Sequence, residues 1–561
     1  MAKLKKKEKA PEITLGQQMA GYGVSLLATF YVFIMLVIYP LYFNNKYYDM
    51  GNAKYTFFQY VSATFLIIFL LIYIGWLIAY RNSFSFKDVF RKLSVTDWFV
   101  GFFCIFSYLS FLFSEYKDVA LRGYDGWFMG LISQVMFVLI YFIISRFWKW
   151  SPTTLGLAVI SAAVTYQLAV WQRFSIDPLK MYEDLGAEYI EKFISTLGQT
   201  TWFSSYAVLL FPLGVFYYWY DNKLWVRILA GLFTALGFGS LCTVNSDSAY
   251  VAYTLTLLVF FWFSFESNQA FQRFIEIVLI GLCTFRIIGI AQICFPERMI
   301  ELISGTEEIS FFVTQSNFML ICLILAIIIY FGYFVLCHHP ADKKRGGQKK
   351  TERTYVFDIR EFRFVRIWVA EAAAFVLAGT ALLVVLSTEG LLPDAFSGLS
   401  HIGFFNFNDE WGNFRGFNWR MAVKAISSAS VKDMLIGVGP DCFAMSMNKY
   451  CAEEVATFWQ GMQLACAHNE FLNMLVTQGI FGVVTYIGIF VSFIIRGIKC
   501  GEKEKVIMPF VAAALAYMGH NFFCYQQCIC TPTVFIMMGI GEMIIRTCNK
   551  EKDSAANEKS G

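Results

Sequence analysis

The chain has 561 residues, of which 57% are hydrophobic, 19% are aromatic and only 15% are charged. Its formal net charge is +4 and its mean hydropathy is +0.54. Because soluble domains usually carry about 25% charged residues, this composition excludes a disordered chain, a basic nucleic-acid-binding domain and an ordinary cytosolic enzyme. It predicts a polytopic membrane protein instead.

Apolar stretches long enough to cross a bilayer as helices recur along the whole chain. We predict an all-α membrane protein with about 14 transmembrane helices of roughly 20 residues each. They lie near residues 20–43, 57–80, 97–114, 127–145, 154–171, 201–220, 228–245, 248–265, 274–295, 317–337, 367–387, 470–495, 508–525 and 531–546. The short separation of 228–245 from 248–265 leaves the count open there.

The distribution of Lys and Arg predicts the orientation, because loops rich in these residues stay on the cytoplasmic side of a membrane. With the basic N-terminal segment 1–19 in the cytoplasm, most of the 45 Lys and Arg residues fall in inner segments, above all in 338–366. We therefore expect both termini, including the tail 547–561, to be cytoplasmic. The first span is long and lacks a small-residue cleavage site, which indicates an uncleaved anchor.

One outer loop, residues 388–469, is much longer than the others and rich in aromatic residues, unlike a linker. Helix signals lie near 416–430, and Gly437-Val-Gly439-Pro440 indicates a tight turn. We expect a folded, partly helical extracytoplasmic cap. It would separate transmembrane helices 1–11, within 20–387, from helices 12–14, within 470–546.

His468 stands where this outer loop re-enters the membrane. Asn469 suits the N-cap of the helix expected to begin at 470. The positive end of that helix favours a neutral imidazole, which can accept a proton, and it also attracts phosphate. A purely structural role for His468 beside the helix cap stays open from these residues alone.

His468-Asn469, followed after nine residues by Gly479-x-x-Gly482 and preceded by a large outer loop, resembles the signature of the O-antigen ligase and polymerase family of membrane glycosyltransferases. The segments 415–419 (Arg-Gly-Phe-Asn-Trp) and 437–439 (Gly-Val-Gly) resemble the "Arg-x-x-x-Trp … Gly-x-Gly" part of that family's pattern. The glycines Gly479 and Gly482 also suit close helix packing.

The resemblance covers about 405–545 well and is weak before that. Ser195-Thr-Leu-Gly198-Gln199 is similar to the family's "Thr-Leu-Gly-Asn" stretch, with Gln in place of Asn. The run 242–248 departs from the pattern, because Asp247 stands where the family has an arginine.

The resemblance implies a donor glycan on a polyprenyl diphosphate, such as undecaprenyl diphosphate, and an acceptor hydroxyl on a glycan, a lipid or a protein. Histidine suits the base that takes the hydroxyl proton, which implies that role for His468. Guanidinium groups grip diphosphate with a bidentate fork, and this implies Arg415 first and Arg420 second. The alternative for both arginines is a solvated or salt-bridged loop residue.

The implied reaction is an inverting, metal-independent transfer at the outer face of the bacterial cytoplasmic membrane, in surface polysaccharide assembly. The first outer loop offers only Asp49 as a metal ligand, and the acidic pair Asp409-Glu410 is interpreted as solvated surface, so no metal is expected. No cofactor and no nucleic acid is expected either. A polysaccharide polymerase of the same family differs only in its acceptor. A lipid-linked oligosaccharide flippase is a further alternative, although we find no internal repeat of the kind common in transporters.

Arg286 is the one basic residue in the middle of a predicted span, and an ionisable residue in a membrane is a functional candidate by default. We expect it to pair with Asp247, since pairing lowers the cost of both charges. Arg122, Asn469 and His520 are further candidates for lining the site, and a satisfied core residue is the alternative for His520.

Three outer cysteines, Cys442, Cys451 and Cys466, face an oxidising compartment. We expect at most one disulfide there, with Cys442–Cys451 favoured because these residues are closest in sequence.

Overall fold

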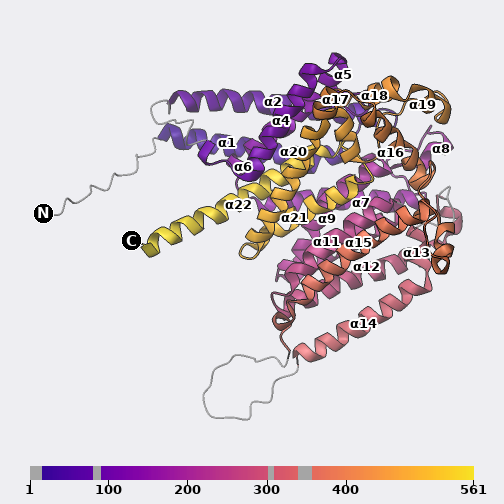
Figure 1. Cartoon of the computed structure of the whole chain (residues 1–561). Helices are drawn as coiled ribbons and strands as arrows, with labels where there is room; N and C mark the ends of the chain where they lie inside the picture. Colours follow the sequence, from indigo (N-terminus) through magenta and orange to yellow (C-terminus); the bar gives the residue numbers. More distant parts are fainter. Residues whose placement is uncertain (1–14, 80–89, 245, 301–308, 339–356, 561) are drawn as a thin grey trace, which may run out of the picture.

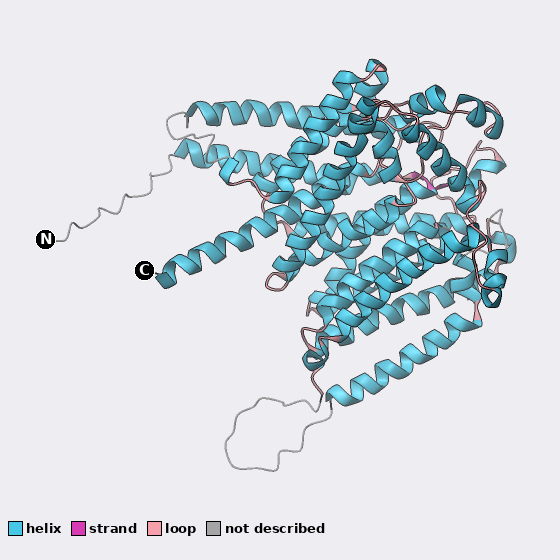
Figure 2. Cartoon of the chain, in the orientation of Figure 1, coloured by secondary structure: helices cyan, strands magenta, loops and turns pink. Residues whose placement is uncertain are grey.

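The computed structural model describes residues 15–79, 90–244, 246–300, 309–338 and 357–560. Helices form nearly all the regular structure of these ranges (Figure 2). The exception within them is one short antiparallel pair, β1 (Phe193–Ile194) and β2 (Gly198–Gln199), with Ile194 opposite Gly198. The long helices run side by side in one bundle (Figure 1).

The long helices follow one another along the chain, and the longest connection separates α15 from α20. They are α1 (Leu15–Phe33), continued by η1 (Ile34–Ile38) and η2 (Tyr39–Leu41), α2 (Met50–Ala79), α4 (Val95–Phe113), α6 (Leu131–Phe147), α7 (Pro152–Arg173), α9 (Thr200–Tyr220), α10 (Leu224–Val244), α11 (Asp247–Ser264), α12 (Asn268–Cys294), α14 (Asn317–His338), α15 (Val365–Thr388), α20 (Glu470–Gly501), α21 (Met508–Asn521) and α22 (Thr531–Ser560).

Shorter helices occupy the connections. They are α5 (Lys117–Arg122), α8 (Ala187–Ile190), η3 (Pro296–Arg298), α13 (Ile309–Gln315), η5 (Ile359–Phe362), η6 (Asp394–His401), η7 (Gly403–Phe405), α16 (Trp411–Ser427), α17 (Val431–Ile436), α18 (Phe443–Tyr450), α19 (Ala452–Phe458) and η8 (Lys505–Ile507).

Ten helices in the described ranges are long and apolar enough to cross a membrane, and α6 is an apolar helix of shorter length. Every span that we predicted overlaps a helix, and 228–245 and 248–265 fall on two separate helices, α10 and α11. The prediction of an all-α polytopic membrane protein is therefore confirmed. The number of spans stays a prediction, because α9, α21 and α22 are helices that do not meet the same criteria of length and apolarity.

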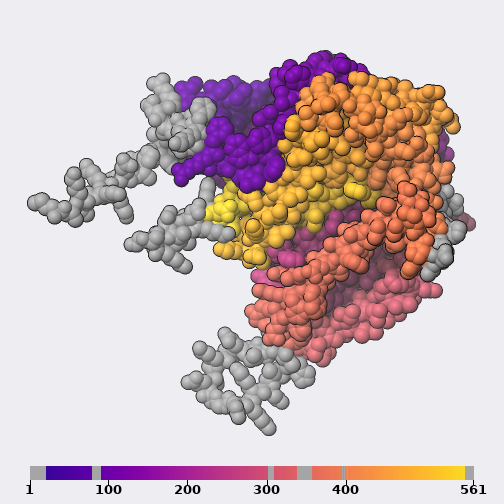
Figure 3. Space-filling model, in the orientation of Figure 1, coloured from indigo at the N-terminus to yellow at the C-terminus, as the bar shows by residue number. Residues whose placement is uncertain are grey.

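The interior of the bundle lies around α6, α9, α21 and α22, whose large side chains are buried together. Helices α14 and α15 lie at the periphery, and the most apolar window of α15 contains no buried residue. Figure 3 shows the surface hollowed between α15 and α14. Exposed Phe, Ile, Leu and Val side chains on both helices fit contact with lipid.

Residues 389–469, the cap segment, cover one end of the bundle, where α16–α19 gather (Figures 1 and 3). The segment has a core of its own, which includes Phe417, Met421, Phe443 and Met447. The helix signals near 416–430 correspond to α16. The expectation of a partly helical segment between α15 and α20 therefore holds for its structure, whereas its side of the membrane stays a prediction.

The cap segment is anchored where helix α20 is interrupted. Gly479 has φ +70°, which breaks the helical path, and the amides of Val438 and Gly439 donate to the carbonyls of Val476 and Thr477, at 3.3 and 2.9 Å. A Cβ on Gly479 would lie 2.4 Å from the backbone of Leu435. Gly479 thus serves close backbone packing, which we predicted, and it also docks the cap.

We expect Gly479→Ala to weaken the docking of the cap segment. The substitution combines the strain of a left-handed residue, about 1–2 kcal/mol, with a backbone clash. Gly461→Ala is the matched control, since Gly461 has φ +86° but open space around its Cβ position. Limited proteolysis of the cap and the apparent melting temperature should separate the two variants. Equal behaviour of both would contradict the docking role.

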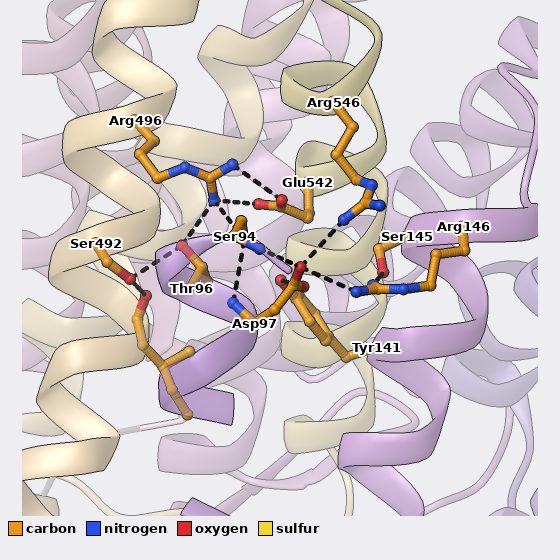
Figure 4. A network of polar contacts seen from close by, with 11 residues as sticks. Ser94, Thr96, Asp97, Tyr141, Ser145, Arg146, Ser492, Arg496, Glu542 and Arg546 are labelled. Atoms are coloured by element: carbon orange, nitrogen blue, oxygen red, sulfur yellow. Dashed lines mark hydrogen bonds and ion pairs between the residues drawn. The ribbon is translucent and has the colours of Figure 1, made fainter. Parts of the chain in front are cut away.

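A buried network of ion pairs joins the start of α4 and the last turns of α6 and α20 to the middle of α22 (Figure 4). The fully buried Asp97 carboxylate lies 2.9 Å from Arg146 and 3.1 Å from Arg546, and it accepts a hydrogen bond from Tyr141. Arg496 donates two hydrogen bonds, of 2.6 and 3.0 Å, to the buried Glu542 carboxylate. These carboxylates are compensated, so the network joins four helices without an unpaired buried acid.

We expect Glu542→Gln to destabilise the protein strongly, because it leaves the Arg496 guanidinium inside the bundle without its partner charge. Removing one member of a buried pair costs about 3–5 kcal/mol, which should appear as a lower apparent melting temperature. Asp118→Asn is the control, since the pair Asp118–Arg122 is 82% and 73% exposed and should contribute little. Equal melting temperatures for the two variants would contradict a stabilising role of the network.

The predicted Cys442–Cys451 bridge is wrong, because every cysteine of the chain is a free thiol in the structure. The two thiols have different neighbours: Cys442 contacts the carbonyl of Pro440, and Cys451 contacts that of Met421. Closeness in sequence does not bring them together, because α18 lies between them.

Candidate functional site

His468 lies at the junction of the cap segment and α20. Its φ of +50° places it in a left-handed turn, and the next residue, Asn469, caps the helix by accepting a hydrogen bond from the Leu472 amide at 3.0 Å. The predicted N-cap is therefore confirmed. The helix cap is formed by the Asn469 side chain, so the half-buried imidazole of His468 is not needed for it.

The electrostatics of this junction keep His468 neutral. Burial, with a further contribution from the nearby charge of Arg415, lowers the pKa of His468 to about 3. The imidazole ring packs edge-to-face against the Tyr525 ring, with centroids 5.0 Å apart. The imidazole is therefore neutral and, in the free protein, a weak base.

Arg415 is brought to His468 by a kink at the start of α16. Residues 412–414 have positive φ values, which turn the chain before the regular helix begins. The Arg415 guanidinium donates from Nε to the Phe523 carbonyl at 3.0 Å and from Nη1 to the Gly412 carbonyl at 2.6 Å. Burial lowers the pKa of this group, whose charge acts on both His468 and His520.

Tyr525 connects His468 to the segment before α9. Its hydroxyl donates to Gln199 Oε1 at 3.3 Å and accepts from Trp202 Nε1 at 3.3 Å. Gln199 ends β2 and begins the turn into α9. The Tyr525 side chain therefore lies between His468 and the segment 195–199, which the sequence resemblance singled out.

His520 lies on the bundle side of the same cluster. The side chain is fully buried, and its Nε2 lies 3.0 Å from Ser205 Oγ on α9. The Ser205 hydroxyl also lies 3.8 Å from the Cys524 thiol. The alternative of a satisfied core histidine therefore holds for Nε2, whereas Nδ1 has no hydrogen-bond partner among the described residues.

Two buried acids that sequence analysis missed support the cluster from either side. Asp441 accepts hydrogen bonds from the amides of Tyr124 and Met129, at 2.7 and 2.8 Å, and burial raises its pKa to about 7. Glu470, in the first turn of α20, accepts from the Gln526 amide at 2.6 Å. The only signal for them was their position, directly after the Gly-Val-Gly-Pro turn and directly after the helix cap.

The turn that Asp441 holds carries an aromatic side chain into the cluster. Trp127 packs edge-to-face on Tyr525, with centroids 4.5 Å apart. Tyr525 is thereby held between Trp127 and His468. No sequence motif indicated Tyr525, because its contacts join three segments that are distant along the chain.

The predicted pairing of Arg286 with Asp247 is wrong. Arg286 Nη1 donates to the carbonyls of Thr314 and Gln315, at 3.4 Å each, and the described residues contain no ion pair between it and Asp247. The cation whose charge acts on Asp247 is Arg415. The reason is geometric: Arg286 is in the middle of α12 beside α13, whereas Asp247 begins α11.

Arg420 and Arg122 lie at the surface. Arg420 makes two hydrogen bonds with the Asp409 carboxylate, at 2.9 and 2.6 Å, and is 54% exposed. Arg122 is 73% exposed and lies 3.5 Å from Asp118. Of the predicted arginines, Arg415 is thus the one placed with His468.

Comparison of the chain with models of known protein families finds no match, and comparison with curated proteins finds none either. The chemical capacity of the site therefore follows from its residues. A neutral imidazole can accept a proton, and a guanidinium beside it can hold an anionic group.

Proposed function

We propose that the chain is a membrane glycosyltransferase that moves a glycan from a polyprenyl diphosphate to an acceptor hydroxyl. One observation supports this most: His468 packs against the Tyr525 ring, and the charge of Arg415 acts on both His468 and Tyr525 at the same junction. A proton acceptor next to a diphosphate-binding cation is the pair of groups that this displacement requires.

In the proposed reaction the acceptor hydroxyl gives its proton to His468 and its oxygen attacks the anomeric carbon. The bond from that carbon to the diphosphate oxygen breaks, and its electrons leave with the diphosphate. Arg415 stabilises the charge that develops on the departing group. A single displacement inverts the anomeric configuration, and no metal or cofactor takes part in this proposal.

The proposed setting is the bacterial cytoplasmic membrane, with both termini inside and the cap segment outside, in surface polysaccharide assembly. The hollow between α15 and α14, lined by exposed apolar side chains, would take the polyprenyl tail (Figure 3). The acceptor distinguishes a ligase from a polymerase, and both use the same donor chemistry.

The pH dependence of transfer should differ between free and donor-bound protein. In the free protein the pKa of His468 is about 3, because of burial and the Arg415 charge. A bound diphosphate adds negative charge next to both groups, which should raise this pKa towards neutrality. Because kcat/KM reports the free protein and kcat reports the complex, we expect the acidic limb of kcat to lie at higher pH. Coincident limbs would contradict the coupling.

The experiment that tests the proposal in cells is deletion of the gene followed by analysis of surface glycans. We expect loss or shortening of one surface glycan together with accumulation of its polyprenyl diphosphate precursor. Complementation with the wild-type gene should restore the glycan, and with His468→Ala it should not. An unchanged glycan profile after deletion would contradict the proposal.

A further inference from the structure

Six aromatic rings form a continuous surface beside Arg415. They come from the cap segment and from the turn between α21 and α22. We call them the outer aromatic cluster: Phe404, Phe407, Trp411, Trp419, Phe522 and Phe523.

Trp419 is the centre of the cluster. Its ring lies 5.3 Å from that of Trp411, 5.7 Å from that of Phe522 and 6.3 Å from that of Phe523, measured between centroids. Trp419 and Phe523 are nearly parallel, with 23° between their planes. The rings thus present faces as well as edges.

The cluster is incompletely covered by the chain. Phe404 is 54% exposed and Phe522 is 46% exposed. The indole N–H of Trp411 donates to the Phe404 carbonyl, whereas the buried indole N–H of Trp419 has no hydrogen-bond partner in the described part. Trp148 and Trp459 have buried indole N–H groups of the same kind, so it is the exposure of the rings that indicates a ligand surface.

Polar side chains are interleaved with these rings along the chain. Asn408, Asp409 and Glu410 precede Trp411, and Asn418 precedes Trp419. The Asn418 side chain is 2% exposed, and its Oδ1 accepts no hydrogen bond from the described residues. The exposed aromatic faces match the apolar C–H faces of a sugar ring, and nearby polar residues such as Glu410 are exposed on the same segment. A surface that meets only lipid would not need these polar groups.

The position of the cluster relative to Arg415 decides which sugar it would meet. Arg415 Nε donates to the carbonyl of Phe523, a member of the cluster. A sugar bonded directly to a diphosphate at Arg415 must lie within one linkage of it. The donor's first sugar would therefore reach the faces of Phe523 and Trp419.

We propose that the outer aromatic cluster is the subsite for the pyranose ring attached to the donor diphosphate. This inference rests on the proposed function, because it assumes a diphosphate at Arg415. Trp419 provides the stacking face, beside the exposed rings of Phe404 and Phe522. The subsite would make the protein select glycosylated over bare prenyl diphosphates.

The test compares two probes, farnesyl diphosphate and farnesyl diphosphoryl-glucose, by their Kd values for purified full-length protein. His468→Ala serves as the parent, so that no turnover occurs. We expect the parent to bind the glucose-bearing probe more tightly. Trp419→Ala should weaken that probe about tenfold, the equivalent of one good aromatic contact, while leaving farnesyl diphosphate within about twofold. Trp419→Phe should retain most of the preference.

Trp225→Ala is the control, because Trp225 is 62% exposed at the start of α10 and outside the cluster. If Trp419→Ala does not fold, Phe522→Leu replaces an exposed ring of the same cluster with the same expectation. A parent without preference for the glucose-bearing probe would overturn the inference, as would equal weakening of both probes, which would assign the cluster to lipid contact. Glycan transfer by the wild-type protein is measured in parallel. If the protein transfers glycan but does not prefer the glucose-bearing probe, the subsite is wrong while the proposed function is kept.

Discussion

Replacing His468 with Ala should reduce glycan transfer by about 10²–10⁴-fold, the usual contribution of a general base. The expectation follows from the neutral, half-buried imidazole beside Arg415. Donor binding should persist, because the diphosphate contact belongs to Arg415. Transfer and donor affinity are measured on the same purified preparation, so that the loss can be assigned to turnover.

Asn469→Ala is the matched variant for a structural explanation of that loss. It removes the helix cap, at a cost of about 1 kcal/mol, and leaves the imidazole in place. We expect a lower melting temperature with transfer largely retained. If His468→Ala instead kept near-normal transfer, the residue would be structural and the base would have to be sought elsewhere in the cluster.

Arg415→Ala should impair both donor binding and turnover. The guanidinium is partly committed to the carbonyls of Phe523 and Gly412, so its loss also frees the start of α16 from the α21–α22 turn. Charge-assisted contacts to a bound anion contribute about 1.5–3 kcal/mol, which predicts roughly a 10- to 100-fold weaker Kd for a prenyl diphosphate.

Arg415→Lys tests whether the geometry of the fork is needed. Lys keeps the charge but has no planar pair of donors, so we expect it to rescue little. Arg420→Ala should have a much smaller effect, because Arg420 is exposed and its fork is occupied by Asp409. Comparable losses for Arg415→Ala and Arg420→Ala would show that the site extends to the surface arginine.

Local signals predicted much of this architecture. Apolar stretches located a helix at each expected span, and Asn469 located the start of α20 within one residue. The helix signals near 416–430 located α16, and the Gly-Val-Gly-Pro run located the turn that docks on α20. Each of these features depends on neighbours within a few residues, which a single sequence displays directly.

Contacts between distant segments could not be predicted in this way. Arg286 and Asp247 were the two unusual charges of the middle spans, yet they lie beside different helices, and only the packing of α16 brings Arg415 near Asp247. Tyr525, Ser205 and Asp441 are unremarkable in the sequence and acquire their roles through the hydrogen-bond partners described above, which are 312 to 326 residues away.

The most direct measurement is transfer by purified protein. A labelled polyprenyl diphosphate-linked glycan and a candidate acceptor are incubated with the protein in a buffer that contains a metal chelator and no nucleotide. The account predicts that label moves to the acceptor with an inverted anomeric linkage, that free polyprenyl diphosphate appears in equal amount, and that His468→Ala stops both. Transport of the intact lipid-linked glycan across a vesicle membrane without any cleavage of the diphosphate linkage would contradict it.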